Sequence, residues 1–480
     1  MTPISADVQV NLLILRSDMK KLMLAAALPA AFIACDAKQK PNVVIIMADD
    51  LGWGDVSYHG SVIQTPNIDR LASDGIELDR HYAASVSSPT RAGLMTGRYP
   101  SRFGIRETVI PPWREYGLPV EERTIADMLA DNGYKDRAVV GKWHLGHGRM
   151  AYYPLNRGFT HFYGHLNGAV DYFTHEREGE LDWHDDWESS YDKGYSTDLL
   201  TEEAVKCIDD YSKSGPYFLY VAFNAPHTPY QAPEDEIAEH ISLDEFNALP
   251  KKDKNGYTYR AMVTRLDKGI GKILDAIERS GEKDNTLILF MSDNGGVPGM
   301  EPYSTNAPLR GTKFTEFDGG VRVNAVISWP KRFKQGGRKV ECVTSFIDIL
   351  PTLADIVGDR RQPKDYPCDG SSLLPLLTGK VRTMDRDIYL GVGAAVNNDC
   401  KMIIAGRNKG MGLQRDFFID YEAEPYEAHN SPEGLQDPEK QRMKDFIIQY
   451  DTITPYWKEI PFGQGRNGFV PPKEWKVTKP

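Results

Sequence analysis

The sequence predicts an α/β fold with a central, mostly parallel sheet, followed by a smaller α+β part at the C-terminal end. Short apolar runs alternate with amphipathic stretches of helical spacing over most of the chain. The apolar runs are unbroken, which is typical of parallel strands buried on both faces. After residue 377 the pattern changes to short strand-like pieces and one late helix. These observations indicate a large α/β part and a second, smaller subdomain.

The elements follow from these patterns in chain order. We expect strands at 43–47, 138–140, 217–223 and 286–291, and helical spacing at 68–78, 125–129, 199–211 and 257–279. The smaller part shows strand-like pieces at 388–390, 402–405 and 417–419 and a helix at 438–450. Gly379 and a basic, loop-like run place the boundary near 380, giving a larger domain at 36–380 and a C-terminal subdomain, an antiparallel sheet plus a helix, at 381–480.

Composition and charge indicate a globular protein that does not bind nucleic acid. The 480 residues are 41% hydrophobic and 26% charged, which is typical of an ordinary globular chain. The net charge of −11 argues against a nucleic-acid partner, because a phosphate backbone requires a basic surface. A local basic pocket for a small anion stays compatible with this charge.

Residues 1–35 have the features of a lipoprotein leader. Translation is expected to start at Met19, where two lysines precede an apolar run at 22–33 that is too short to span a membrane. Cys35 follows at the expected cleavage site, so we expect export and a lipid on Cys35 as the only membrane attachment. The alternative is an ordinary hydrophobic first helix. The other cysteines form no CxxC pair, so a thiolate zinc site is not expected, and disulfides stay open and unassignable.

Oxygen-bearing side chains follow two predicted buried strands. Asp49 and Asp50 come after the strand at 43–47, and Asp293 and Asn294 come after the strand at 286–291. Ligands bind at the carboxyl ends of strands in open α/β sheets. Carboxylate and amide oxygens suit calcium or magnesium rather than zinc. Each pair alone could be a solvated turn or an Asx turn, but the repetition favours one metal site.

Cationic candidates also follow strands. Lys142 and His144 come after the strand at 138–140, and His227 comes after the strand at 217–223. If the strand continued, Lys142 and His144 would share one face and reach one anion. Taken singly, a surface lysine and a core histidine are the commoner explanations. Spacing alone gives weaker support for Lys313 as an anion-binding residue.

Six ordered motifs resemble those of the formylglycine-dependent sulfatases. They cover nearly the whole chain after Pro41 and are Asp49-Asp50 with Gly52-Trp53-Gly54-Asp55, Ser87-Ser88-Pro89-Thr90-Arg91, Gly141 to Gly146, His227-Thr228-Pro229, Asp293 to Gly296, and Arg310 to Lys313 with Gly319 to Arg322. The resemblance implies an alkaline-phosphatase-like fold and hydrolysis of sulfate esters. Met291 and residues 315–318 differ from the residues most common in that family, but they do not replace any of the functional positions named below.

The resemblance also implies a role for each matching residue. Ser87 would be oxidised by a maturation enzyme to formylglycine, and the hydrated aldehyde would attack sulfur. Calcium, or magnesium in its place, would be bound by Asp49, Asp50, Ser87, Asp293 and Asn294. Arg91 would hold the hydrate, and Lys142, His227 and Lys313 would grip the sulfate. His227 would act as general acid and His144 as the base that releases sulfate.

The nature of Ser87 leaves two explanations open. A natural serine here resembles sulfatases matured by an oxygen-independent enzyme and indicates a bacterial source, with a periplasmic or outer-membrane-anchored lipoprotein. A cysteine replaced by serine would read identically. Unmodified serine lacks the second hydroxyl of the hydrate, so turnover would stop after one event.

The segment around 164–176 is similar to the arylsulfatase B branch, whose substrates are 4-sulfated N-acetylgalactosamine residues. Asp171 and His175, with Trp183, His184 and Trp187, give it an aromatic and polar character suited to sugar recognition. We expect a 4-O-sulfated galactose or N-acetylgalactosamine unit of a host or algal glycan as substrate. A surface loop packed on the core explains the segment equally well. A phosphatase or phosphonate hydrolase of the same superfold and a non-catalytic sulfated-glycan-binding lipoprotein remain as alternatives.

Overall fold

The structure is a computed structural model that describes residues 40–480 except 300–302, 335, 362–366, 431–436 and 456–459. The predicted leader and Cys35 therefore lie outside the described residues. The elements below all belong to one unit, Pro41–Pro480. Within the described residues, no helix combines the length and apolar character needed to cross a bilayer.

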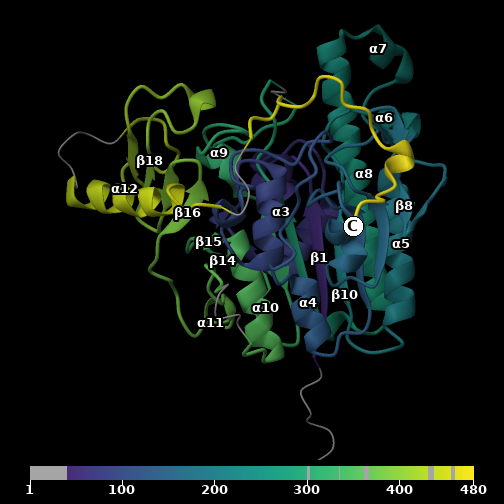
Figure 1. The fold of residues 1–480 in the computed structure, drawn as a ribbon, viewed down its shortest axis with the longest axis horizontal. Coiled ribbons are helices and arrows are strands. Elements are labelled where there is room, and N and C mark those ends of the chain that lie inside the picture. The colour runs from purple at the N-terminus through teal and green to yellow at the C-terminus, as the bar shows by residue number, and fades with distance from the viewer. Residues whose placement is uncertain (1–39, 300–302, 335, 362–366, 431–436, 456–459) are drawn as a thin grey trace, which may run out of the picture. The chain divides into compact units, whose positions relative to one another are not determined.

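A ten-stranded sheet forms the centre of this unit, as predicted (Figure 1). Its five central strands are parallel and lie in the order β11 (Thr286–Ser292), β1 (Asn42–Ala48), β10 (Phe218–Ala222), β4 (Arg137–Lys142) and β5 (His161–His165). Beyond β11 lie β13 (Ala325–Ser328), β2 (Ile76–Leu78) and β14 (Arg338–Val340), and beyond β5 lie β8 (His184–Asp185) and β9 (Glu188–Ser189). The carboxyl ends of the parallel strands therefore meet at one edge.

Alternate residues of β1 enter two different cores. Val43, Ile45 and Met47 pack in one apolar cluster, and Val44 and Ile46 pack in another, because successive strand side chains point to opposite faces. The first core includes residues of α3 (Ser87–Thr96), α4 (Ile125–Asp131) and α10 (Ile349–Val357), and the second includes residues of α2 (Pro66–Asp74), α5 (Ser196–Tyr211) and α8 (Lys251–Arg279). Figure 1 shows α3 and α10 on one side of β1 and β10, with α5 and α8 on the other.

The C-terminal part contains a four-stranded antiparallel sheet and a helix, which confirms the predicted fold class. The strands are β16 (Ile388–Gly391), β17 (Ala394–Val396), β18 (Cys400–Ile403) and β19 (Phe417–Asp420), and the helix is α12 (Asp437–Asp451). The sequence pattern missed β17. A separate small sheet contains β12 (Arg322–Val323), β3 (His81–Tyr82) and β15 (Thr344–Ser345). The other short strands and helices are β6 (Glu176–Arg177), β7 (Glu180–Leu181), α6 (Glu234–Ala238), α7 (Leu243–Ala248), α9 (Asp318–Val321) and α11 (Leu374–Leu377).

One local prediction was wrong. The helical spacing at 68–78 covers a helix that ends at Asp74, after which Gly75 leads into strand β2. The helix after the serine motif begins at Ser87 itself, with Pro89 inside its first turn. Proline is tolerated there because its missing N–H group would have no intrahelical partner. The disulfide question is also answered for the four described cysteines, Cys207, Cys342, Cys368 and Cys400, which are free.

Candidate active site

Four neighbouring strand ends bring the predicted polar residues together. Asp49 and Asp50 follow β1, and Asp293 follows β11, which lies beside β1 in the sheet. Lys142 ends β4, and His227 lies on the loop after β10. Asp50 has a backbone φ of 68°, so the chain has left the strand conformation there, as one shared site requires.

Ser87 lies buried at the first turn of α3. Its Oγ accepts a hydrogen bond from Arg91 Nε at 2.8 Å, one helical turn along the chain. The Nδ1 atom of His144 lies 3.2 Å from the same Oγ. Free N–H groups at a helix N-terminus favour a negative charge at this position. The predicted nucleophile therefore has a guanidinium, a histidine and a helix terminus around it.

Arg91 connects Ser87 to the acidic side of the site. Its second terminal nitrogen donates to Asp293 Oδ2 at 2.9 Å, and its first lies 3.3 Å from the hydroxyl of Tyr220. The guanidinium is fully buried, so these contacts fix its plane. Sequence analysis missed Tyr220, because the residue lies inside the apolar run that forms β10.

Two lysines pair with the strand-end carboxylates. Lys142 Nζ donates to Asp49 Oδ2 at 2.6 Å, and Lys313 Nζ donates to Asp50 at 2.7 Å and 2.9 Å. His227 Nε2 lies 3.6 Å from Asp50 Oδ2. The structure thus places the three residues expected to grip the sulfate beside the two carboxylates that follow β1, including Lys313, for which spacing gave the weakest support.

Two buried oxygens fit a metal ion. Asp49 Oδ1 and Asn294 Oδ1 are buried and have no hydrogen-bond partner among the described residues. An unpaired buried oxygen is costly unless something satisfies it. The ligand atoms of Asp49, Asp50 and His227 lie within 4.8 Å of one another. These are hard oxygen donors apart from the imidazole, so the residues present fit calcium or magnesium.

The charges in the site shift several pKa values. Burial and the neighbouring Asp293 carboxylate raise the pKa of Asp49 to about 8, although Lys142 opposes the rise. Burial lowers the pKa of Lys142 to about 8, although Asp49 opposes the fall. Burial, followed by the charge of Lys142, holds the pKa of His144 well below its usual range. A neutral His144 is suited to accept a proton.

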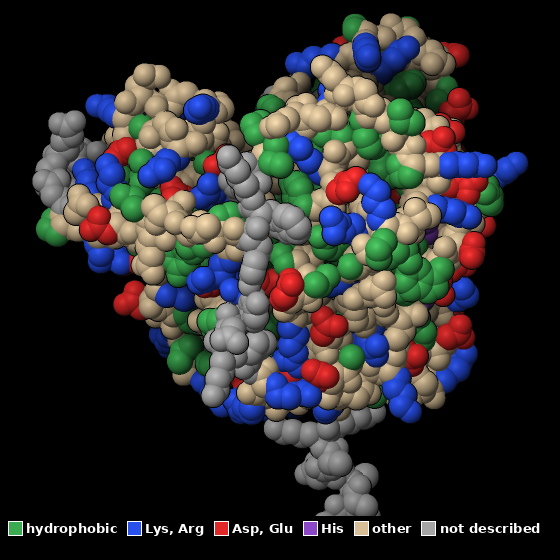
Figure 2. Space-filling model, viewed as in Figure 1, with side chains coloured by type: hydrophobic (Ala, Val, Ile, Leu, Met, Phe, Trp, Pro, Cys, Tyr) green, Lys and Arg blue, Asp and Glu red, His purple; other side chains and the backbone are tan. Residues whose placement is uncertain are grey.

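The positive charge available to an anion is local. Figure 2 shows acidic and basic side chains interspersed over the described part of the face that it draws, without one dominant sign. Lys142, Lys313 and Arg91, by contrast, are buried side by side around the strand ends. Positive charge for an anion would therefore come from this buried cluster rather than from a basic surface.

His144 has left the strand that carries Lys142. The strand β4 ends at Lys142, and His144 has a φ of 56°, so the two residues reach the site without sharing a strand face. The backbone N–H of His144 donates to the carbonyl of Leu166 at 3.1 Å. A methyl group on Gly168 would lie 2.5 Å from the His144 ring, so glycine allows the close approach of this turn.

Asp182 holds the turn beside His144 and was missed by sequence analysis. It is fully buried and accepts hydrogen bonds from the backbone N–H groups of Leu166 and Asn167, both at 2.9 Å. It also accepts from the Asn167 side chain at 2.8 Å and from His184 Nε2 at 3.1 Å. No sequence signal linked Asp182 to His144, because the connection runs through backbone groups.

Asp171 and His175 have local partners instead. Asp171 accepts from the N–H groups of Phe173 and Thr174 and from Gln231. His175 is buried, bonds to the carbonyl of Gly194 and stacks on a tryptophan at 4.4 Å. No described hydrogen bond or ion pair joins either residue to the cluster at the strand ends.

Tyr172, the residue after Asp171, does reach the site. The Tyr172 hydroxyl donates to the carbonyls of Asn224 and His227, at 2.6 Å and 2.8 Å. Of the aromatic residues predicted nearby, Trp183 and His184 are buried, and Trp187 is 46% exposed. Tyr172 therefore supports the His227 loop from within a segment that was singled out for other residues.

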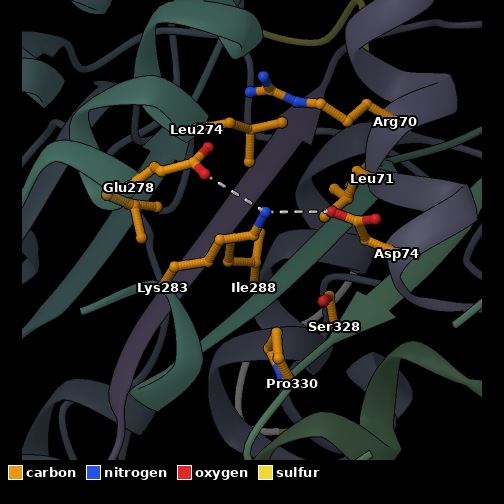
Figure 3. Close-up of a pocket in the computed structure, with 10 residues that line it drawn as sticks. Arg70, Leu71, Asp74, Leu274, Glu278, Lys283, Ile288, Ser328 and Pro330 are labelled. Carbon is orange, nitrogen blue, oxygen red and sulfur yellow. Dashed lines mark ion pairs between the residues drawn. The ribbon is translucent and has the colours of Figure 1, made fainter. Parts of the chain in front are cut away.

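A hollow lies at the opposite end of the sheet, near the start of β11. Figure 3 shows Lys283 between Asp74 and Glu278, with which it forms ion pairs of 3.4 Å and 3.8 Å. Leu71, Leu274 and Ile288 give the hollow an apolar floor. It contains neither a histidine nor a nucleophile paired with a base, so the strand-end cluster is the better candidate for chemistry.

Comparisons with known proteins agree with this geometry. The family model described as Sulfatase matches residues 41–358. Arylsulfatase J of Mus musculus is 33% identical over 357 residues, which cover 73% of this chain and 58% of that protein. N-acetylgalactosamine-6-sulfatase of Homo sapiens is 32% identical over 380 residues, covering 74% of this chain and 69% of that protein.

A solved structure is similar over nearly its whole length. The crystal structure of Ps i-CgsB in complex with k-i-k-neocarrahexaose matches with a TM-score of 0.78 at 31% identity, covering 89% of this chain and 97% of that chain. The family match spans Asp49-Asp50, Asp293-Asn294, the serine motif and Lys313. The chain therefore belongs to the sulfatase family, the formylglycine-dependent family that its motifs resemble.

Proposed function

We propose that this protein is a sulfuric ester hydrolase that removes sulfate from a carbohydrate, using a formylglycine made from Ser87. The observation that carries the proposal is the position of Ser87 Oγ, 2.8 Å from Arg91 Nε and 3.2 Å from His144 Nδ1, beside two lysine–aspartate pairs. This arrangement combines a nucleophile, a base and anion-binding groups in one buried site.

The oxidised and hydrated residue 87 would supply two hydroxyl groups on one carbon, one to attack sulfur and one to lose a proton when sulfate leaves. Arg91 orients the oxygen of residue 87 through Nε. Lys142 and Lys313 offset the charge of the sulfate, which otherwise repels a nucleophile. These roles use contacts that already exist in the site.

The two histidines divide the proton transfers. His144 is neutral because burial holds its pKa low, so it accepts the proton from residue 87. The His227 side chain is 20% exposed and faces Asp50, so it lies where the leaving alcohol meets solvent. Burial lowers the pKa of His227 to about 3, although Asp50 opposes the fall, and a bound sulfate anion would raise this pKa toward the protonated imidazole that donates to the leaving oxygen.

Asp49, Asp50, Asp293 and Asn294, together with residue 87, would hold calcium or magnesium. The ion would polarise the oxygens of the sulfate and add positive charge where the site holds three carboxylates. The unpaired oxygens of Asp49 and Asn294 support this assignment.

The proposed substrate is a 4-O-sulfated galactose or N-acetylgalactosamine unit of a host or algal glycan. Two relatives support a galactose-type sugar, since one is named for N-acetylgalactosamine and the other was solved with a neocarrahexaose. The first of these names refers to position 6. The preference for position 4 rests on the likeness of residues 164–176 to the arylsulfatase B branch.

The test is desulfation of a defined panel by protein produced together with a formylglycine-maturation enzyme. The panel contains galactose and N-acetylgalactosamine with sulfate at position 4 or 6, and the matching phosphate esters. We expect sulfate release, fastest from the 4-sulfates, and mass spectrometry of the active protein should show residue 87 short of two hydrogens. Full steady-state activity with unchanged Ser87 would refute the mechanism.

The alternatives predict different results in the same panel. A phosphatase or phosphonate hydrolase would prefer the phosphate esters. A glycan-binding lipoprotein would bind the sulfated sugars without releasing sulfate, even after maturation.

We also propose that the protein is an exported bacterial lipoprotein with its lipid on Cys35. The leader pattern from Met19 supports this proposal. Mass spectrometry of the membrane-associated protein should show a lipidated N-terminal cysteine, whereas a mature chain that retains residues 19–34 would contradict it.

A further inference from the structure

Phe314, the residue after Lys313, combines exposure with an unfavourable backbone conformation. Its side chain is 55% exposed, and its φ is 74°, in the left-handed region that favours glycine. This conformation is unfavourable for a residue with a side chain, because the Cβ atom crowds the backbone. Trp475, the other described aromatic of this kind outside the histidines, is fully buried. Packing therefore explains Trp475 but does not explain the exposed ring of Phe314.

The backbone of Phe314 is held from both sides. Its N–H donates to the carbonyl of Ser85 at 3.0 Å, and its carbonyl accepts from Asn408 Nδ2 at 2.9 Å. The buried Glu316 joins the same two partners, since it accepts from Ser85 Oγ at 3.0 Å and from Asn408 Nδ2 at 2.6 Å. Ser85 lies two residues before Ser87. The backbone from which the ring extends is thus fixed relative to the predicted nucleophile.

The ring lies beside the cation that would bind the sulfate. Lys313 Nζ is 5.4 Å from the centre of the Phe314 ring and donates to Asp50. Lys313 is buried, whereas the adjoining ring is open to solvent. An ester whose sulfate is held by Lys313 must extend its alcohol part away from the buried carboxylates. The exposed ring offers that part an apolar surface.

We propose that Phe314 is a specificity-determining residue whose ring packs against the C–H face of the sugar that carries the sulfate. The inference rests on the proposed function and names one element of its substrate recognition. An aromatic ring buries a large apolar area at low entropic cost, and a pyranose offers a matching apolar face. The strain at Phe314 would then be retained because it presents the ring at this place.

The first test measures kinetics of the matured protein with three variants. Phe314→Ala and Phe314→Gly should raise KM for the best sulfated sugar roughly tenfold, with kcat little changed, because each removes the ring contact. The Ki of inorganic sulfate as an inhibitor should stay constant, because sulfate does not reach the ring. Phe314→Tyr should behave as the wild type. Tyr191→Ala is the matched control, since Tyr191 is also an exposed aromatic, at 67%.

Phe314→Gly separates the ring from the loop. Glycine adopts the left-handed conformation without strain, so this variant should be at least as resistant to thermal unfolding as Phe314→Ala. A normal KM in Phe314→Gly would overturn the inference. So would a rise in the Ki of sulfate equal to the rise in KM, because the ring would then act through Lys313.

The second test does not require turnover. Calorimetry with unmatured protein, which retains Ser87, measures binding of the same sulfated sugars. We expect the glycine variant to bind roughly tenfold more weakly than the wild type. If the wild type binds none of the panel, the inference fails. If binding depends on Phe314 but the matured protein releases no sulfate, the proposed hydrolysis fails and the ring contact stands.

Discussion

Arg91 donates from Nε to Ser87 Oγ at 2.8 Å across one turn of α3, while another nitrogen of the same guanidinium donates to Asp293 at 2.9 Å. One planar group thus sets the distance between the predicted nucleophile and the predicted metal ligands. A lysine would keep the positive charge but offers a single nitrogen, so it could serve one of these partners and leave the other unpaired.

Replacing Arg91 with lysine should therefore lower kcat of the matured protein roughly a hundredfold or more, because the orienting hydrogen bonds are lost while the charge remains. Steady-state kinetics on the best sulfate ester measures the effect. Mass spectrometry must first show that residue 87 is converted to the same extent as in the wild type. Activity within threefold of the wild type, with full conversion, would argue against the bridging role.

The metal assignment predicts that Asp293→Asn abolishes the response to calcium. Calcium at about 100 times its Kd should stabilise the wild type by about 2.7 kcal/mol, seen as a higher Tm. The asparagine variant is nearly isosteric but loses a charged ligand and its ion pair with Arg91. It should show little calcium-dependent shift and no sulfatase activity.

Asp210→Asn is the control for this measurement. Asp210 is exposed on α5 and pairs with Lys213 within the same turn, so its variant should respond to calcium as the wild type does. A full calcium shift in Asp293→Asn would show that this carboxylate is not a ligand.

Much of the site could be predicted because polar residues directly follow apolar strands. The run at 43–47 fixes where β1 ends, and Asp49 and Asp50 then fall at the ligand-binding edge. Periodicity describes burial, so it could not show that the hydroxyl of Tyr220, inside a buried strand, reaches Arg91.

Asp182 illustrates the other limit of sequence analysis. It acts on His144 through the backbone of residues 166–167, and a side chain that binds backbone groups leaves no motif. The sequence also could not show where the side chains of Asp171 and His175 bind. Their described hydrogen bonds are all outside the strand-end cluster.

Asp182→Asn should therefore lower kcat through His144. The amide would place an NH₂ group against N–H donors that Asp182 now accepts from, so the turn at Leu166 and the backbone bond to His144 would loosen. We expect a fall of roughly tenfold to a hundredfold in kcat, with a changed pH profile of kcat and an intact calcium shift in Tm.

The control for Asp182 lies on the same segment. Asp192 is exposed and accepts from Tyr163 and Ser190, so Asp192→Asn should leave kcat and its pH profile unchanged. Loss of the calcium shift in Asp182→Asn would indicate general damage to the site rather than a role in positioning His144.

Glu316 predicts a pH dependence of stability. Burial raises the pKa of its carboxyl from 4.5 to about 7, although hydrogen bonds from Asn408 and Ser85 oppose the rise. Between these values the folded state retains a proton that the unfolded state has lost, so this group lowers the free energy of unfolding as pH rises from about 4.5 to about 7. Above that range the loss is complete, on the order of 3 kcal/mol.

Glu316→Gln removes this titration and keeps an acceptor for Asn408, while the Ser85 hydroxyl can turn to accept from the new amide. Denaturant unfolding at pH 5 and pH 8, in the absence of metal, should show the variant gaining stability relative to the wild type as pH rises. Asp359 has a lowered pKa, because hydrogen bonds from Arg361 together outweigh its burial, so it is ionised in both the folded and the unfolded state between pH 5 and pH 8, and Asp359→Asn, the control, should differ from the wild type by the same amount at both pH values. If the free energies of unfolding of Glu316→Gln and the wild type differed by the same amount at both pH values, the Glu316 carboxyl would ionise normally in the folded protein.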